Sequence, residues 1–377
     1  MKKRVSILIY SLASGGAERV VSILLYELKN KYDITLFLMN DTLFYDMPSD
    51  INIVYLEKSN PLENGVKKLL KLPFLAWKYK KLNNHSDISF SLMNRPNYIN
   101  TLAKMMGMRS KVIVSERAMP SLQHAYGLQG RINRFLIKSL YNKADLVTAN
   151  SLGNSADLRE NFSCEDVRTI NNPFDIELIQ KLSREEVTLN GDKFIFMTVG
   201  RLDSGKNHKL LINAMCDIDA VLYIIGEGEL KQELQNIIDE SDLHEKVTLL
   251  GRLENPYKYL SKANCFVFAS KREGFPNVLV EALACGIPVI STDCKSGPRE
   301  ILDPNGDVNV KLLDDIELVK YGVLTPVDNE ELLKKSMSLI MKDDILRDSY
   351  KKEAKTRAND FNKYQTLKKW FSIFDMV

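Results

Sequence analysis

The chain has few residues of the kinds that build disulfides or metal sites. Its 377 residues include five cysteines and four histidines, with no CxxC pair and no histidine spacing typical of metal ligands. This pattern disfavours a disulfide framework and a zinc site, and it is typical of buried thiols in a reducing cytoplasm. We therefore predict no metal ion and no other cofactor.

Long apolar runs and two common nucleotide motifs are also missing. No run of about 18 apolar residues occurs, so no transmembrane helix is predicted. The sequence Gly15-Gly16-Ala17-Glu18 is not the GxGxxG of dinucleotide-binding folds, and Asn207 stands where the P-loop pattern has Ser or Thr. No nucleic-acid-binding module is recognisable, so no nucleic-acid partner is expected.

The chain does contain a regular alternation of short apolar runs and helical patterns, in a composition of 45% hydrophobic and 27% charged residues that is typical of soluble proteins. Strands are expected at Val5–Tyr10, Ile34–Met39, Ile53–Leu56, Ile88–Leu92, Val112–Ser115, Leu146–Ala149, Phe194–Val199, Val221–Ile225, Val247–Leu250, Cys265–Ala269 and Pro288–Ser291. Helices are expected at Ala17–Asn30, Tyr98–Met106, Ile132–Tyr141, His208–Met215, Glu229–Asp239 and Val278–Ala284. Such alternation predicts an α/β fold with parallel sheets.

The length and the two series of strands predict two Rossmann-like domains that face each other across a cleft. The first covers residues 1–180, the second covers 190–355, and the polar stretch Ser183–Asp192 is the expected hinge. A helix over 356–377 has no strand after it and is expected to pack back on the first domain. In open α/β sheets ligands bind beyond the carboxyl ends of strands, where the loops described next lie.

Residues 270–300 are the most informative part of the chain. A strand that ends near Ala269 leads into a loop with Glu273, and a helix follows from about Asn277. The first N–H groups of a helix have no internal partner and carry partial positive charge, so they hold an anion well. Glu281, about one turn into the helix, could accept hydrogen bonds from a vicinal diol such as a ribose. Alternatively, both glutamates are solvated surface residues.

The loop after the first strand of the second half carries two cations, Arg201 and Lys206. Two fixed positive charges at the carboxyl end of a strand suit a diphosphate. Taken alone, the motif favours a charged surface loop.

The first half of the chain is basic. Residues 1–188 carry 26 Lys and Arg against 19 Asp and Glu, a net charge of +7, and the remainder carries 26 against 30, a net charge of −4. Residues 61–82 concentrate lysines among apolar and aromatic side chains, which suits an anionic membrane surface. The candidate contact residues are Lys67, Lys68, Lys71, Trp77 and Lys78. The alternative is a solvated helix, and Pro73 is expected to break or kink it.

Taken together and in this order, the motifs Gly-Gly-Ala-Glu, GRLDSGKNH, IIGEGEL and EGFPNVLVEALACGIPVI resemble the retaining GT-B glycosyltransferases of family 4 type. The similarity covers the whole chain. More narrowly, IYSLASGGAERVV, LKLPFLAWKYKKL, NRPNYI and NPYKYL are similar to bacterial N-acetylgalactosaminyltransferases that extend polyprenyl-diphosphate-linked glycans.

The resemblance implies roles for individual residues. Arg201, Lys206 and Glu273 would be catalytic, the two cations on the donor diphosphate and Glu273 on hydroxyls of the donor sugar. The remaining substrate-binding residues would be Gly15, Gly16, Glu116, Arg117, Gly274, Phe275, Pro276, Asn277 and Glu281. Relatives have a histidine where Arg117 stands, so the role of that histidine does not transfer directly.

The resemblance also implies a function. We expect transfer of a HexNAc, with GalNAc from UDP-GalNAc the first choice, to an undecaprenyl-diphosphate-linked sugar in O-antigen or other surface glycan assembly. The enzyme would need no metal and would sit peripherally on the cytoplasmic face of the cell membrane. The alternatives are a hexosyltransferase with another nucleotide sugar, a GT-B nucleotide-sugar epimerase and a non-catalytic nucleotide-sugar sensor.

Overall fold

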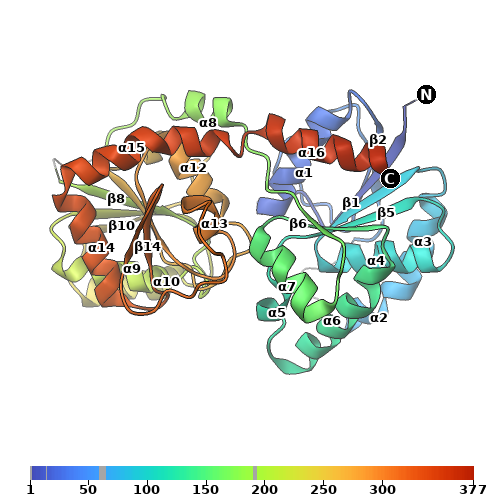
Figure 1. Cartoon of the computed structure of the whole chain (residues 1–377), viewed down its shortest axis with the longest axis horizontal. Helices are drawn as coiled ribbons and strands as arrows, with labels where there is room; N and C mark the ends of the chain where they lie inside the picture. Colours follow the sequence, from blue (N-terminus) through green and yellow to red (C-terminus); the bar gives the residue numbers. More distant parts are fainter. Residues whose placement is uncertain (1, 14, 59–64, 190–192) are drawn as a thin grey trace. The chain divides into compact units, whose positions relative to one another are not determined.

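A computed structural model describes residues 2–13, 15–58, 65–189 and 193–377 of the chain. The chain divides into two compact units, the first made of residues 1–173 and 364–377 and the second of residues 174–363 (Figure 1). Each unit is an α/β domain with its own sheet, which confirms the predicted fold class. Among the described residues, no helix combines the length and the apolar character that crossing a bilayer requires.

The first unit contains a seven-stranded parallel sheet in the order β3-β2-β1-β4-β5-β6-β7. Its strands are β1 (Arg4–Ile9), β2 (Asp33–Leu38), β3 (Asn52–Tyr55), β4 (Ile88–Leu92), β5 (Lys111–Glu116), β6 (Leu146–Ala149) and β7 (Val167–Thr169). The central strands β1 and β4 are buried almost throughout, because helices cover both faces of the sheet.

The helices of the first unit form two layers. They are α1 (Gly16–Leu28), α2 (Gly65–Leu70), α3 (Leu72–Leu82), α4 (Asn94–Met105), α5 (Pro120–Gln123), α6 (Gly127–Leu140), η1 (Tyr141–Lys143), α7 (Leu152–Phe162) and α16 (Lys363–Met376). Buried residues of α3, α4, α6 and α7 share one hydrophobic core with one face of the sheet. Helices α1 and α16 share the other core with the opposite face.

The C-terminal helix α16 belongs to the first unit, although the chain reaches it from the second. Its Trp370 and Phe374 are buried and contact Phe90 of β4. The helical pattern at the end of the sequence is interrupted at 360–362, where Asn362 forms a bridge with Phe174. The final helix is thus a separate element, α16, that follows α15 (Asp344–Asn359).

The second unit contains a seven-stranded sheet in the order β10-β9-β8-β11-β12-β14-β13. Its strands are β8 (Ile195–Val199), β9 (Val221–Ile225), β10 (Val247–Gly251), β11 (Cys265–Phe268), β12 (Val289–Thr292), β13 (Glu317–Val319) and β14 (Gly322–Thr325). All neighbours pair in parallel except β13, which is antiparallel to β14. The carboxyl ends of β8, β9, β11 and β12 therefore meet at one edge of the sheet.

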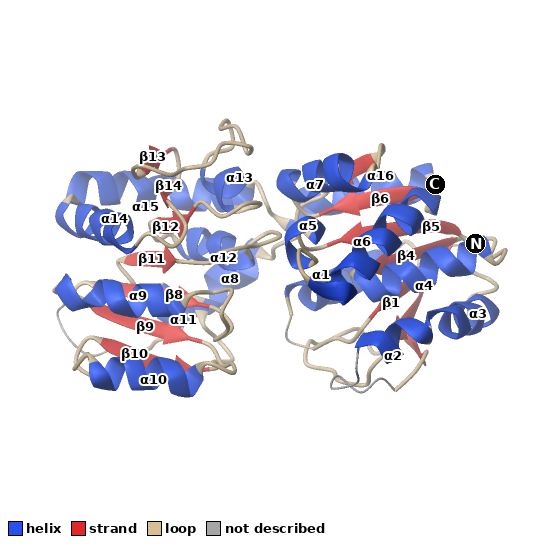
Figure 2. Cartoon of the chain, turned by 90° about the horizontal axis from the view of Figure 1, so that it is seen from below, coloured by secondary structure: helices blue, strands red, loops and turns tan. Residues whose placement is uncertain are grey.

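Helices again lie on both faces of this sheet (Figure 2). They are α8 (Ile176–Leu182), α9 (His208–Ala214), η2 (Met215–Asp217), α10 (Lys231–Glu240), α11 (Tyr257–Leu260), α12 (Asn277–Cys285), α13 (Pro298–Leu302), α14 (Glu330–Lys342) and α15. Helix α8 packs into the second unit through Ile176 and Ile179. This packing is why the second unit begins at residue 174, before the polar stretch that the sequence marks as a hinge. Residues 190–192 of that stretch lie outside the described residues.

Candidate functional site

The loop that follows β8 is shaped by its own side chains. The Oδ1 atom of Asp203 accepts hydrogen bonds from the backbone N–H groups of Gly205 (2.9 Å) and Lys206 (3.1 Å). Asn207 then adopts a left-handed conformation, with φ of 55°, and precedes α9. An Asp that bonds the backbone two and three residues ahead fixes a tight turn. The turn sets the direction in which Lys206 leaves the loop.

The loop after β9 lies directly against the loop after β8. A Cβ atom on Gly226 would overlap the carbonyl oxygen of Gly200, and one on Gly228 would overlap that of Leu202. Backbone hydrogen bonds join Leu202 N–H to Glu227 O and Leu230 N–H to Leu202 O, both at 3.0 Å. Because glycine has no Cβ atom, Gly226 and Gly228 allow the backbones of the two loops to approach closely.

Lys206 and Glu273 form a close ion pair at this edge of the sheet. Lys206 Nζ lies 2.5 Å from Glu273 Oε1, and the two side chains are 26% and 11% exposed. The Lys206 ammonium also lies 5.5 Å from the centre of the Phe268 ring, at the end of β11. The N–H of Lys271 donates to Gly205 O at 2.9 Å, which ties the loop after β11 to the loop after β8. The structure therefore brings together two residues that the sequence singles out 67 positions apart.

A cavity of about 300 Å³ opens beside this pair. Its lining comes from three loops and consists of Asp203, Ser204, Gly205, Lys206, Glu229 and Arg272. Sequence reasoning missed Arg272 and Glu229, although Arg272 directly precedes Glu273. Arg201 is not among the described lining residues; its side chain is 72% exposed and its Nη1 lies 3.9 Å from Asp203 Oδ2.

Helix α12 begins at Asn277, as the sequence predicts. The residue before it, Pro276, offers no side-chain cap, and the partial positive charge at the start of the helix suits an anion. Phe275 and Pro276 are buried, which holds the loop between Glu273 and the helix in place. Glu281 lies inside α12 and is 5% exposed.

A second loop, after β12, supports this helix start. Ser296 Oγ donates to Gly274 O at 2.7 Å. Gly297 has φ of 100°, and a Cβ atom there would overlap the ring of Pro276. The hydroxyl of Ser296 thus supports the loop before α12, and sequence reasoning missed it because Ser is too common in loops to be informative on its own.

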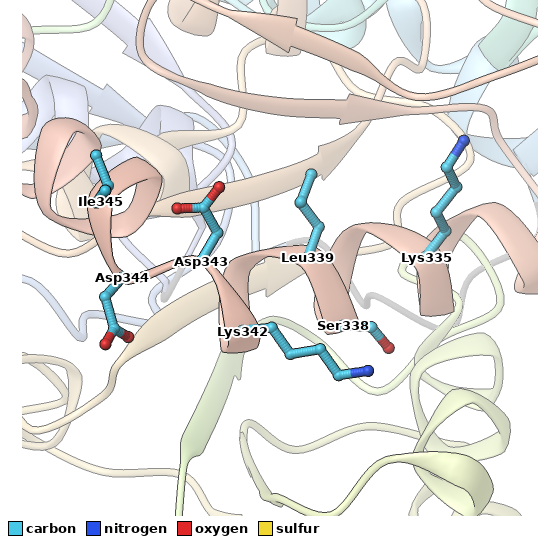
Figure 3. A pocket seen from close by; sticks show the side chains of 7 residues that line it. All are labelled: Lys335, Ser338, Leu339, Lys342, Asp343, Asp344 and Ile345. Atoms are coloured by element: carbon cyan, nitrogen blue, oxygen red, sulfur yellow. The ribbon is translucent and has the colours of Figure 1, made fainter.

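A larger hollow, of about 600 Å³, lies elsewhere in the second unit, where α14 meets α15. It is lined by Lys335, Ser338, Leu339, Lys342, Asp343, Asp344 and Ile345. In Figure 3 these side chains leave the helices in different directions, with Lys335 and Leu339 on one side and Ser338 and Lys342 on the other. They do not converge on one point, and no residue singled out by the sequence lies among them.

In the first unit, Gly15 and Gly16 mark the start of α1. Gly15 is extended and precedes the helix, which begins at Gly16. A Cβ atom on Gly15 would overlap the carboxylate of Glu18, so this side chain lies over the glycine. The glycines stand at the carboxyl end of β1, where the sequence places them.

Glu116 is buried and Arg117 is half-buried at the end of β5. Glu116 is 1% exposed and accepts hydrogen bonds from Tyr141 Oη (2.7 Å) and from the N–H of Arg117 (2.9 Å). Burial raises the pKa of Glu116, while these hydrogen bonds oppose the shift. Burial also lowers the pKa of Arg117 to about 10. Arg117 donates to Asn172 Oδ1, and its buried Nε has no partner among the described atoms.

Asn94 and His124 belong to the same cluster of polar side chains as Glu116, and sequence reasoning missed both. His124 Nε2 lies 2.5 Å from the side-chain amide of Asn94. When the amide oxygen faces His124, the amide nitrogen donates to Glu116 Oε2 at 2.9 Å. Burial lowers the pKa of His124, with the Arg134 charge a smaller cause. Only the tertiary fold brings Asn94, after β4, to Glu116, at the end of β5, and to His124, between α5 and α6.

The basic stretch forms two helices: α2 ends at Leu70, and Pro73 lies in the first turn of α3. The predicted break at Pro73 is therefore confirmed. Leu70, Phe74 and Trp77 are 76%, 62% and 46% exposed. Residues Lys67 and Lys71 are also exposed and Lys68 is half-buried, whereas Lys78 donates to Leu56 O at 2.5 Å. Residues 61–64 of the stretch lie outside the described residues.

His208, at the start of α9, gives the second unit a predictable response to pH. It is buried, and burial together with the nearby Lys206 charge lowers its pKa from 6.5 to about 4. Between these values the unfolded chain binds a proton that the folded chain does not, so stability falls as the pH drops through this window. The expected loss is about 3 kcal/mol at pH 4 relative to neutral pH.

His208→Gln should remove this part of the pH dependence. The measurement is the urea midpoint of the parent and the variant from neutral pH to pH 4, compared as slopes because the substitution also changes stability at every pH. If the two proteins lose stability in parallel, His208 does not titrate as described.

Among the described residues, no three His, Cys, Asp or Glu side chains lie together in a way that could hold a metal ion.

The family model of "Glycosyl transferases group 1" matches residues 179–357, which include the Lys206–Glu273 pair and α12. The chain is 46% identical over 368 residues, 96% of each chain, to the N-acetylgalactosamine-N,N'-diacetylbacillosaminyl-diphospho-undecaprenol 4-alpha-N-acetylgalactosaminyltransferase of Campylobacter jejuni.

A second protein of the same organism is 27% identical over 385 residues, 99% of each chain. It is named GalNAc-alpha-(1->4)-GalNAc-alpha-(1->3)-diNAcBac-PP-undecaprenol alpha-1,4-N-acetyl-D-galactosaminyltransferase. Among solved structures, HepE of Anabaena in complex with UDP is similar over 100% of both chains, with a TM-score of 0.80 and 19% identity. Sucrose-phosphate synthase of Thermosynechococcus elongatus has a TM-score of 0.83 at 18% identity, over 100% of this chain and 99% of that one.

Proposed function

Because this chain belongs to the group 1 glycosyl transferases, with the GT-B fold, we propose that it transfers GalNAc from UDP-GalNAc to a sugar carried on undecaprenyl diphosphate. The observation that carries the proposal is the Lys206–Glu273 pair beside the start of α12, within the segment that the family model matches. The 46% identity over 96% of both chains to a transferase named for this donor sugar and this lipid supports the choice of substrates.

The residues of the second unit suit a nucleotide diphosphate sugar. Lys206 would face the diphosphate, with Arg201 supplying further positive charge from the same loop. Glu273 would accept hydrogen bonds from hydroxyls of the sugar, and Glu281 from those of the ribose. Negative charge grows on the diphosphate as the bond to the sugar breaks, and Lys206 together with the N–H groups at the start of α12 would stabilise it there.

The chemistry can be written without a metal. The anomeric carbon loses its bond to the oxygen of the β-phosphate and gains one to the acceptor hydroxyl oxygen on the same face of the sugar, which retains the configuration. The departing phosphate oxygen takes the proton of that hydroxyl. Positive charge from Arg201 and Lys206 would do the work that a divalent cation does in other nucleotide-sugar enzymes.

The first unit suits the lipid-linked acceptor. An undecaprenyl diphosphate sugar is anionic and lies at a membrane, and the exposed lysines and aromatic side chains of α2 and α3 fit such a surface. We infer that the enzyme acts peripherally on the inner face of the cell membrane, in the assembly of O-antigen or another surface glycan.

A donor panel tests the function. The purified protein is incubated with UDP-, GDP- and ADP-sugars and a polyprenyl-diphosphate-linked acceptor in detergent, with EDTA present, and the lipid is followed by mass spectrometry. A gain of one HexNAc from the UDP donor supports the proposal. A gain of a hexose from another donor would show that the enzyme is a hexosyltransferase that uses that nucleotide sugar. Conversion of the nucleotide sugar without transfer to the lipid would indicate an epimerase.

Reversing the charge of Lys67 and Lys71 should weaken binding to anionic vesicles. Each cation near such a surface contributes about 1 kcal/mol, so Lys67→Glu/Lys71→Glu is expected to lower affinity by at least roughly 25-fold at low salt, and by less as salt rises. Vesicle co-sedimentation over a salt series measures this. Lys78→Glu alone should change affinity less, because its ammonium is bonded to Leu56 O. Equal binding by parent and double variant removes α2 from the membrane contact.

A further inference from the structure

Helix α6 presents an apolar and basic face to solvent that the proposed roles leave unused. Leu128 and Phe135 are 72% and 69% exposed, and Tyr126, just before the helix, is 91% exposed. Arg131 and Lys138 of the same helix are exposed as well. Contiguous exposed apolar side chains rimmed by polar residues mark surfaces that bind a protein or a membrane.

Helical geometry sorts these residues into two ridges. At about 100° per residue, Leu128 and Phe135 fall within about 20° of each other, and Arg131 and Lys138 form a second ridge about 60° away. The buried residues of α6, among them Asn133 and Ile137, centre about 180° from the apolar ridge. The apolar ridge thus points directly away from the core of the unit, so packing within the unit does not explain it.

The charge on this face is of one sign. Residues 126–143 contain four Lys or Arg and no Asp or Glu, and residues 65–82 of α2 and α3 contain six Lys and no Asp or Glu. Arg134, the one of the four basic side chains that turns inward, lies over the Phe162 ring and donates to Ser121 O. Segments such as these two, which combine apolar side chains with cations and contain no carboxylates, are complementary to an anionic lipid surface.

Helix α6 also lies next to the basic helix α2. Gly65, the first residue of α2, is in contact with the side-chain amide of Gln129 in the first turn of α6. Helix α4 packs against both α3 and α6, between them on one face of the sheet (Figure 2). The exposed side chains of α2, α3 and α6 therefore belong to one layer of the first unit.

We propose that α6 is a second membrane-binding element, whose Tyr126, Leu128 and Phe135 enter the interface while Arg131 and Lys138 contact anionic headgroups. The inference rests on the proposed membrane contact and assigns it to two separate segments of the chain. The partner that covers this face is a bilayer with anionic phospholipid. The alternative partner is a second copy of the chain, and the test below distinguishes the two.

The test uses full-length protein and vesicles of phosphatidylcholine, with and without phosphatidylglycerol, and no nucleotide sugar. Leu128→Ser/Phe135→Ser should lower affinity roughly tenfold for both vesicle types, because it removes interfacial apolar contact. Arg131→Gln/Lys138→Gln should lower affinity about 25-fold for the anionic vesicles, at about fivefold per charge, and leave binding to neutral vesicles unchanged.

Matched controls come from the second unit. Leu313→Ser/Ile345→Ser removes two exposed apolar side chains, and Lys351→Gln/Lys352→Gln removes two exposed lysines. Both should bind vesicles like the parent. Because all these positions are exposed, every variant should keep the parent's melting temperature, which shows that each has folded.

Two results overturn the proposal: parental vesicle binding by both α6 variants, or conversion of a dimer to a monomer by Leu128→Ser/Phe135→Ser with vesicle binding unchanged, which assigns the face to a second copy. Sedimentation velocity reports the oligomeric state. Since the vesicle assay contains neither donor nor acceptor, it decides on α6 even if the GalNAc transfer proposed above proves wrong.

Discussion

Lys206→Ala is expected to lower kcat roughly 10²- to 10³-fold, the effect of removing one preorganised partner of a developing negative charge. The ammonium of Lys206 is held 2.5 Å from Glu273 Oε1 and its side chain is three-quarters buried, so in the proposed complex it would face the diphosphate without needing to reorganise. Nucleotide affinity should fall less than kcat, because the charge on the leaving group grows in the transition state. Steady-state kinetics together with calorimetric titration of UDP measures both.

Lys271→Ala is the matched control for this substitution. Lys271 lies two residues before Glu273 and pairs with Asp328 at 2.8 Å, outside the described lining of the cavity. Its loss removes one positive charge from the same edge of the sheet and should change kcat by less than about threefold, as expected for a largely exposed pair. Near-normal turnover of Lys206→Ala, or an equal loss in Lys271→Ala, contradicts a specific role for Lys206.

Glu273→Gln is expected to have the second large effect, lowering kcat/KM for transfer about 10²-fold. The substitution keeps the size of the side chain, but it removes the carboxylate that fixes the Lys206 ammonium and that would accept hydrogen bonds from the sugar. Charge-assisted hydrogen bonds are about twice as strong as neutral ones. Kinetics with the UDP donor and the lipid acceptor measures the loss.

The two substitutions should not act independently. Residues in direct contact show interaction energies, so the double variant Lys206→Ala/Glu273→Gln is expected to be little worse than the poorer single variant. Asp328→Asn, in the neighbouring Lys271–Asp328 pair, serves as the control for loss of a carboxylate. Full additivity in the double variant would show that Lys206 and Glu273 act on different parts of the reaction.

Much of the fold follows from the alternation of apolar runs and helical patterns. The expected strands Ile88–Leu92, Leu146–Ala149 and Val221–Ile225 have the observed bounds, and the others differ by one residue at one or both ends. The short strands β7, β13 and β14 were not predicted. A segment such as Glu317–Val319 has too few residues to show a period, and it forms a strand only by pairing with β14.

The candidate site was predictable where one residue type at one position carries the chemistry. Lys206, Glu273 and the start of α12 stand next to strand ends, and the parallel order of the sheet brings strand ends together. Arg272 and His124 were not predictable, because their neighbours come from loops whose paths depend on tertiary packing. Arg201 is the opposite case: the sequence singles it out, but its side chain extends into solvent.

The proposed reaction is the transfer of GalNAc with retention, to a lipid-linked sugar, and without a metal. The most direct test is to incubate the protein with UDP-GalNAc and a polyprenyl-diphosphate-linked acceptor in EDTA, isolate the lipid product, and determine its mass and the anomeric configuration of the added sugar by NMR. We expect a product heavier by one HexNAc in α linkage. A β-linked product would contradict retention, and unchanged lipid with intact UDP-GalNAc would contradict the transferase assignment for this donor.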